Sequence, residues 1–262
     1  MAEPGGPNFQ DPSGEKTVVG RRTVEEYLRN APAANLVCLY LSRANQPGIN
    51  SSLEKIARDK GVDVRLLDDP EFQSRAAAWP RSQGVFLQVR KPAAASGDAL
   101  EDHIASLANA NVKRDCVLVL DHLEDPANLG SVLRTSAFYG VKIVVIPKDR
   151  SAAVTPAVEK ISSGALSRIR VVEAVNLVRV MEQLKEKGYW VVGSSLSEKS
   201  RPLAGFNWPE KTVLVTGNEH KGLSRLVEER CDFLVKIAGK GGLQSLNAAV
   251  ATAVILDRFF NR

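Results

Sequence analysis

The sequence predicts an α/β fold in which helices cover a mostly parallel β-sheet. Its C-terminal part contains six short runs rich in Val, Ile and Leu, and helical patterns separate most of them. Strands that are buried on both faces of a sheet need such near-continuous apolar runs. Of the 262 residues, 44% are hydrophobic and 25% are charged, which indicates a globular protein and excludes disordered and collagen-like chains.

A change in composition divides the chain. The segment KPAAASGDA, residues 91–99, combines Pro, Gly, Ser and consecutive alanines, which is typical of a linker. We therefore expect a disordered tail over 1–15, a small α/β domain over 16–91, a linker and lead-in helix over 92–112, and a larger domain over 113–262.

Each element of the small domain follows from local patterns. Thr23 is a good N-cap for the helix TVEEYLRN because acidic residues follow it in the first turn. Beyond this helix the pattern predicts strands at 35–42, 62–67 and 84–89 and helices at 51–60 and 70–79.

The larger domain alternates more clearly. Its predicted strands are 116–121, 141–147, 168–172, 189–195, 212–217 and 233–238, and its predicted helices lie near 128–139, 155–163, 175–187, 223–230 and 245–260. Ligands of such sheets bind beyond the carboxyl ends of the strands. The loops after the strands are therefore the place to look for a site.

Several classes of protein are excluded. Cys38, Cys116 and Cys231 are far apart and odd in number, which disfavours disulfides and a structural zinc site and fits a reducing, cytoplasmic compartment. His122 and His220 lack neighbouring ligands at metal-binding spacing, so we expect no metal. No apolar run is long enough to span a membrane, and the net charge of +5 permits a polyanionic partner without requiring one.

Three segments combine a strand end, a Gly or Asn turn and a helix start. They are HLEDPANLGSVLRTSAFYG (122–140), NEHKGLS (218–224) and GKGGLQSLNAAVATAVILDRFF (239–260). Helix N-termini present free N–H groups to anionic or polar ligands. The chain has no GxxxxGK[ST] phosphate loop and no GxGxxG after the first strand of the larger domain, so ordinary nucleotide sites are excluded.

Single residues in these segments have competing interpretations. Asn128 can cap its helix, Gly130 allows close backbone approach, and Arg134 could grip a phosphate. Ser245 and Asn247 could orient a ribose. Taken one at a time, a solvated Arg134 and simple N-capping by Ser245 and Asn247 explain these residues better.

Taken together, the three segments indicate a function far more specifically than any single residue does. DHLEDPANLGSVLRTSAFYG, VTGNEHKGLS and IAGKGGLQSLNAAVATAVIL, in that order, resemble the three motifs of the SpoU (TrmH-like) RNA ribose methyltransferases of the SPOUT superfamily. DRSAAVTPAVEKISSGALSRIRVVEAVNL is most similar to the branch that methylates a guanosine in large-subunit rRNA. VVGRRTVEEYLRN and SQGVFLQV resemble the substrate-binding domain that many members carry, which has a ribosomal-protein-like (L30e-like) fold.

The resemblance implies a homodimer with a trefoil knot, S-adenosylmethionine as cofactor and an RNA substrate. It assigns the polar active-site positions to Asn128, Arg134, Glu219, Ser245 and Asn247, and the cofactor-binding positions to Thr216, Gly217, Asn218, Ile237 and Leu246. Because arginine stays protonated, we expect Arg134 to clamp a phosphate rather than to act as the base, so the proton acceptor is left open.

This chain departs from the family pattern at three places. Ala238-Gly239 stands where Pro-Met is usual, Ala248 where Val is common, and Arg170 where Pro is usual. The change at Arg170 weakens the assignment of the target nucleotide. Two alternatives stay open: a tRNA substrate, and a catalytically inactive RNA-binding assembly factor.

Overall fold

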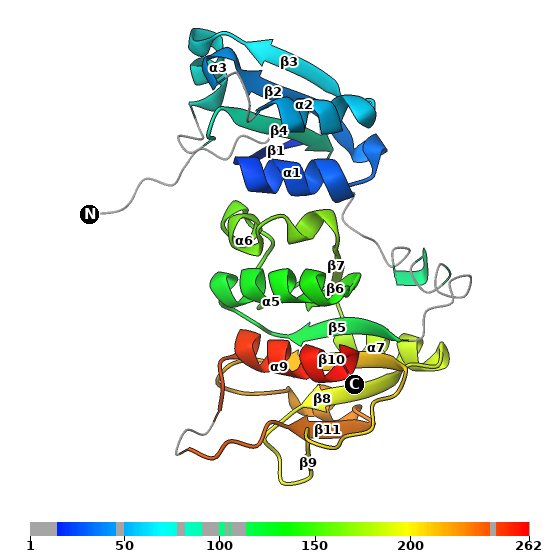
Figure 1. The fold of residues 1–262 in the computed structure, drawn as a ribbon. Helices are drawn as coiled ribbons and strands as arrows, with labels where there is room; N and C mark the ends of the chain where they lie inside the picture. Colours follow the sequence, from blue (N-terminus) through cyan, green and yellow to red (C-terminus); the bar gives the residue numbers. More distant parts are fainter. Residues whose placement is uncertain are drawn as a thin grey trace. The chain divides into compact units, whose positions relative to one another are not determined.

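A computed structural model describes residues 15–45, 50–77, 82–90, 100–102, 105, 114–241 and 245–261 (Figure 1). The chain divides into two compact units, residues 1–93 and 94–262. The linker expected at 91–99 lies outside the described residues. So does the tail expected at 1–15, except for Glu15, which begins the first strand. Among the helices searched, none is long and apolar enough to cross a membrane.

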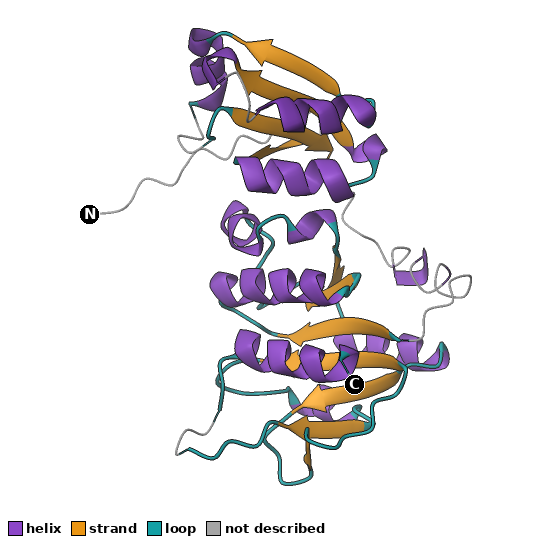
Figure 2. Ribbon diagram, viewed as in Figure 1, coloured by secondary structure: helices purple, strands orange, loops and turns teal. Residues whose placement is uncertain are grey.

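The N-terminal unit is a four-stranded mixed sheet with helices packed against it (Figure 2). The strand order is β1-β4-β2-β3; β4 pairs antiparallel with β1 and β2, and β2 pairs parallel with β3. The elements are β1 (Glu15–Val19), α1 (Arg21–Asn30), β2 (Leu36–Ser42), α2 (Asn50–Asp59), β3 (Asp63–Leu67), α3 (Asp69–Ala76) and β4 (Val85–Arg90).

The first helix does not start where the sequence predicts. Gly20, not Thr23, is the N-cap of α1, and its φ of 89° lies in the left-handed region that favours glycine. Arg21 is then the first helical residue, and its backbone N–H donates to Oε1 of Gln83 at 3.1 Å. The Thr23 prediction is wrong because the turn at Gly20 places the N-cap three residues earlier.

The C-terminal unit is built on a seven-stranded sheet of order β7-β6-β5-β10-β8-β11-β9, and every strand pair that the structure describes in it is parallel. The mostly parallel α/β fold is confirmed. The strands are β5 (Asp115–Asp121), β6 (Ile143–Pro147), β7 (Arg170–Ala174), β8 (Trp190–Ser194), β9 (Arg201–Pro202), β10 (Lys211–Gly217) and β11 (Phe233–Lys236). The helices are α5 (Pro126–Tyr139), α6 (Pro156–Ser162), α7 (Leu177–Glu186), α8 (Arg225–Glu229) and α9 (Ala248–Phe260).

Helices cover both faces of this sheet, and the alternation along β5 shows which face is which. Leu118 and Leu120 belong to a core shared with α5 and α9, whereas Val117 and Val119 belong to a second core shared with α7 and α8. Both faces are therefore buried, which explains the near-continuous Val, Ile and Leu runs in the sequence.

The strand order reverses direction in the middle of the sheet. From β5 the chain moves outward to β6 and β7, and it then crosses to β8 before β10 inserts between β5 and β8. In the β5–β10 pair, Asp121 lies opposite Gly217, so the loops that follow these two strands leave the sheet side by side. This is the topological position at which open α/β sheets bind ligands.

Candidate functional site

Three of the predicted polar residues form a continuous hydrogen-bonded chain. Nδ2 of Asn128, on α5, donates to Oε1 of Glu219 at 2.6 Å. Oδ1 of Asn128 accepts a bond from Nδ2 of Asn247 at 2.9 Å. These residues come from all three motif-bearing segments, and up to 119 positions separate them in the sequence. We refer to Glu219, Asn128 and Asn247 as the amide chain.

The N-terminus of α9 determines which groups donate and which accept in the amide chain. Asn247 is the N-cap of α9, and its Oδ1 accepts the backbone N–H groups of Ala249 at 2.9 Å and Val250 at 3.4 Å. That oxygen is therefore committed, so the side chain can meet Asn128 only through its NH₂ group. Asn128 must then present its oxygen to Asn247 and its NH₂ to Glu219.

Asn128 is available for these contacts because another residue caps α5. Asp125 is the N-cap and accepts the N–H of Ala127 at 2.9 Å, and Pro126 occupies the first turn, where its missing N–H costs nothing. The expectation that Asn128 caps this helix is wrong. Asn128 is the third residue of the helix, and its side chain bonds to the neighbouring loops instead.

The loop that carries Glu219 is a tight turn closed by backbone bonds between Asn218 and Gly222. Oδ1 of Asn218 accepts the N–H groups of His220 and Lys221, and its Nδ2 donates to the carbonyl of His122 at 2.9 Å. Asn218 therefore ties this loop to the loop that follows β5.

Gly217 cannot carry a side chain in this turn. A Cβ at this position would lie 2.2 Å from the backbone carbon and oxygen of Gly222. The glycine is thus required by close approach of the backbone within the turn.

The side chain of Thr216 is unusual among the predicted cofactor-binding residues. It is 4% exposed, and its hydroxyl has no hydrogen-bond partner among the described residues. A buried hydroxyl without a partner costs free energy unless a ligand supplies one. Ile237 is half-buried beyond β11, and Leu246 is exposed before α9, so apolar surface is available nearby in the chain segments that end at this edge.

Arg134 and Ser245 are not brought into the amide chain. Arg134 is exposed on α5 near Phe138, which is 82% exposed, and it has no hydrogen bond or ion pair with another described residue. Ser245 is exposed in the segment before α9.

Gly130, also on α5, serves helix packing: a Cβ there would lie 2.7 Å from Ile161 of α6.

Sequence reasoning missed a second polar cluster at the end of β5. Asp121 is 1% exposed; its Oδ1 lies 2.6 Å from Nδ1 of His122, and its Oδ2 accepts the N–H of Ser224 at 2.6 Å. His122 has a φ of 59°, in the left-handed region that few residues other than glycine adopt, although His, Asn and Asp do so more often than most. A carboxylate that ends a buried strand was the one sequence signal for this cluster, because the left-handed backbone of a histidine cannot be read from residue type.

The thiols are not reactive at neutral pH, and the described acidic residues form no metal-binding cluster. Burial raises the pKa of the Cys231 thiol to about 12 and raises the pKa values of Cys38 and Cys116 as well, so all three stay protonated near neutral pH. No group of three or more His, Cys, Asp or Glu residues that could hold a metal ion occurs in the part of the chain that the structure describes.

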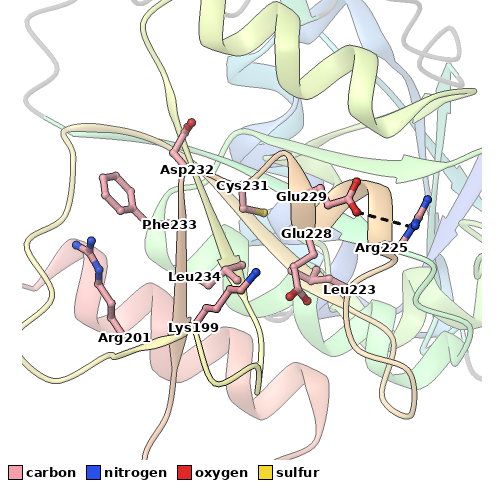
Figure 3. A pocket seen from close by; sticks show the side chains of 10 residues that line it. All are labelled: Lys199, Arg201, Leu223, Arg225, Glu228, Glu229, Cys231, Asp232, Phe233 and Leu234. Carbon is pink, nitrogen blue, oxygen red and sulfur yellow. Dashed lines mark ion pairs between the residues drawn. The ribbon is translucent and has the colours of Figure 1, made fainter.

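A cavity of about 710 Å³ lies beside β11 and α8 and contains none of the predicted site residues (Figure 3). Lys199 and Arg201 line it together with acidic residues, and Arg225 pairs with Glu229, one turn along α8, at 3.8 Å. Three basic and three acidic side chains line the cavity, so it has no net charge that would attract a polyanion.

Comparisons with known proteins place this geometry in a family. The sequence profile of the SpoU rRNA Methylase family matches residues 115–257. The chain is 40% identical over 206 residues to the 23S rRNA (guanosine-2'-O-)-methyltransferase RlmB of Xanthomonas axonopodis pv. citri, covering 79% of this chain and 80% of the relative. It is 34% identical over 241 residues to RlmB of Pseudomonas syringae pv. tomato, covering 91% of this chain and 92% of the relative.

A solved structure has the same fold. The crystal structure of the SpoU methyltransferase AviRb from Streptomyces viridochromogenes, in complex with AdoMet, matches with a TM-score of 0.71 and 23% identity. The match covers 95% of this chain and 90% of AviRb.

Proposed function

Because this chain belongs to the SpoU rRNA Methylase family, we propose that it transfers a methyl group from S-adenosylmethionine to a ribose 2′-hydroxyl, of a guanosine, in large-subunit rRNA. The observation that carries the proposal is the amide chain. Glu219, Asn128 and Asn247 come from three separate segments, and they meet beyond the carboxyl ends of parallel strands, where such folds bind ligands.

The residues at this edge suit the cofactor. The unpartnered hydroxyl of Thr216 can bond to a polar group of the cofactor, and Ile237 and Leu246 can contact its apolar parts. Asn218 and Gly217 shape the turn between them. When bound, S-adenosylmethionine supplies an electrophilic methyl group attached to a sulfonium sulfur.

The amide chain is suited to orient a ribose. Each amide has a remaining N–H, and Glu219 has a second carboxylate oxygen, so the chain offers both donors and acceptors to sugar hydroxyls. Only RNA has the 2′-hydroxyl that would be methylated. Ser245 lies two residues before Asn247 and would extend the same surface.

Arg134 would bind the backbone of the substrate. Its guanidinium is exposed and without a protein partner among the described residues, and a guanidinium can hold a phosphate by two parallel hydrogen bonds. Such a contact would position the target ribose without requiring the arginine to lose a proton.

The larger architecture that we propose follows the family. The segment that carries Ser245 and α9 would form the trefoil knot, and the protein would act as a cytoplasmic homodimer. Residues 16–91 would be an L30e-like domain that binds RNA, with a tail over 1–15, a linker and lead-in helix over 92–112, and the methyltransferase domain over 113–262.

The proposal is tested by transfer of labelled methyl groups from S-adenosylmethionine to unmodified large-subunit rRNA and, separately, to unmodified tRNA. Because 2′-O-methylation protects the adjacent linkage from alkali, alkali-resistant label in rRNA supports the proposal and maps the nucleotide. Label in tRNA alone would overturn the assignment of rRNA as the substrate. A protein that binds no cofactor and labels neither RNA would instead be the assembly factor.

A further inference from the structure

The structure holds a histidine in the geometry of a general base, next to the amide chain. We infer that His122, oriented by Asp121, accepts the proton of the ribose 2′-hydroxyl during methyl transfer. This inference rests on the proposed function and supplies the proton acceptor that Arg134 cannot be, since an arginine stays protonated.

The contacts of His122 fix its tautomer. Nδ1 lies 2.6 Å from Oδ1 of Asp121, whose carboxylate is 1% exposed. Because an ionised carboxylate can only accept, Nδ1 must carry the hydrogen. In the neutral ring Nε2 is then the basic nitrogen, and the His122 side chain is 31% exposed, so a substrate can reach it.

Asp121 is itself held rigidly. Its Oδ2 accepts the N–H of Ser224, the N-cap of α8, at 2.6 Å. One carboxylate therefore connects β5, the loop that carries His122 and the start of α8. Anchoring of this kind holds a base within the small range of geometries in which proton transfer is efficient.

The backbone places His122 at the rim of the amide chain. Its carbonyl accepts Nδ2 of Asn218 at 2.9 Å, and Asn218 is followed directly by Glu219, which bonds Asn128. The φ of 59° is a strained conformation for a histidine. Strain of this kind persists where surrounding contacts hold it, and it is frequent at functional sites.

The charged groups around the imidazole are few. Asp121 is the ionisable side chain that contacts it among the described residues. The loop after β10 adds Glu219, which is bonded to Asn128, and His220 and Lys221, which are exposed. The neighbouring loop after β6 carries three exposed ionisable residues: Lys148, Asp149 and Arg150.

The step balances with these groups alone. The 2′-oxygen forms a bond to the methyl carbon while the carbon–sulfur bond breaks, and that electron pair stays on sulfur as a neutral thioether. The O–H electron pair stays on the 2′-oxygen, and the proton moves to Nε2 of His122. Asp121 then faces an imidazolium and stabilises its charge, as an orienting carboxylate does in other His–Asp pairs.

The test uses His122→Asn, because asparagine tolerates the left-handed backbone and cannot accept the proton. The matched control is His220→Asn, which removes an exposed histidine from the adjacent loop. Single-turnover methyl transfer to rRNA is measured at saturating RNA and cofactor between about pH 5 and pH 8, the range in which imidazoles lose a proton.

We expect the wild-type rate to rise with pH, because the base must be neutral. His122→Asn should lose this rise and fall about 100-fold at the upper end, the lower range for general base catalysis. His220→Asn should keep both the rate and the profile. An unchanged profile in His122→Asn would overturn the inference. A wild-type rate at saturating RNA, with a loss only at subsaturating RNA, would overturn it too and would indicate a phosphate contact.

A second readout does not depend on activity. The chain has three histidines, so ¹⁵N–¹H NMR of its imidazoles can be assigned with the same two variants. We expect His122 to carry its hydrogen on Nδ1 in the neutral form; a hydrogen on Nε2 would refute the base assignment. If the wild type methylated no RNA, the proposed function would fail while this NMR result stood on its own.

Discussion

Two polar clusters lie at the carboxyl ends of β5 and β10, and they differ in how they are held. The amide chain lies on the α5 and α9 side, is partly exposed and joins three segments through neutral amides and one carboxylate. The Asp121 cluster centres on a buried carboxylate that accepts the N–H of Ser224 at the start of α8 and contacts the ring of His122, both at short distance. The comparison teaches that one edge of a sheet can combine exposed groups that face a ligand with a buried carboxylate that holds a neighbouring side chain in place.

If this division is right, removal of the buried Asp121 carboxylate should have the largest effect on stability. Asp121→Ala should lower the free energy of unfolding by about 3 kcal/mol, because it removes two bonds to a charged group and leaves the Ser224 N–H without its acceptor. Urea denaturation followed by circular dichroism measures this. Asp125→Ala, which removes a single exposed cap, should cost about 1 kcal/mol. Equal losses of unfolding free energy in the two variants would contradict the special role of the buried Asp121 carboxylate.

Asn128→Ala should show the opposite behaviour. We expect methyl transfer to fall about 100-fold, because the amide chain loses its middle member. The free energy of unfolding should change by about 1 kcal/mol or less, since the site is partly exposed. Ser131→Ala, one turn further along α5, is the control and should leave the rate unchanged. If Asn128→Ala lost as much unfolding free energy as Asp121→Ala, the role of Asn128 would be to stabilise the fold instead.

The turn between the two clusters allows a sharper test. Gly217→Ala places a Cβ 2.2 Å from the backbone of Gly222, which cannot rotate away as a side chain could. We expect a loss of about 2 kcal/mol in the free energy of unfolding. Gly241→Ala meets nothing within 4 Å and should change it by about 0.5 kcal/mol or less. Similar melting temperatures for the two variants would contradict the close approach.

The smallest expected effect concerns Thr216. Thr216→Val removes the unpartnered hydroxyl and should raise the free energy of unfolding of the cofactor-free protein by up to about 1 kcal/mol. Cofactor affinity, measured by calorimetry, should fall up to about 10-fold if that hydroxyl bonds the cofactor. Unchanged affinity would remove Thr216 from the cofactor site.

Much of the larger domain could be predicted from sequence because buried parallel strands leave a clear apolar signal. The runs at 116–121 and 212–217 correspond to β5 and β10 nearly to the residue. By contrast β9, only Arg201–Pro202, is exposed and too short to show a pattern. The run at 168–172 predicts a strand two residues before β7, because Ile169 is buried just outside it.

The candidate site was predicted less completely, for reasons of geometry. The resemblance pointed to Asn128, Glu219 and Asn247, but the bonds between them depend on which residue caps α5, and two acceptors in the first turn region compete for that role. The sequence also gave no sign that His122 adopts a left-handed backbone or that Asp121 holds its ring. Such features arise only when distant loops meet.

The insertion of β10 has a consequence for synthesis. β10 pairs with β5 over seven residue pairs and with β8 over five, yet β5 precedes it by nearly a hundred positions. Until residue 217 leaves the ribosome, both strands expose unpaired edges that could join other chains. Closing so long a loop is slow, so folding should be limited by this late strand, and nascent chains of this protein should depend on chaperones that shield open sheet edges.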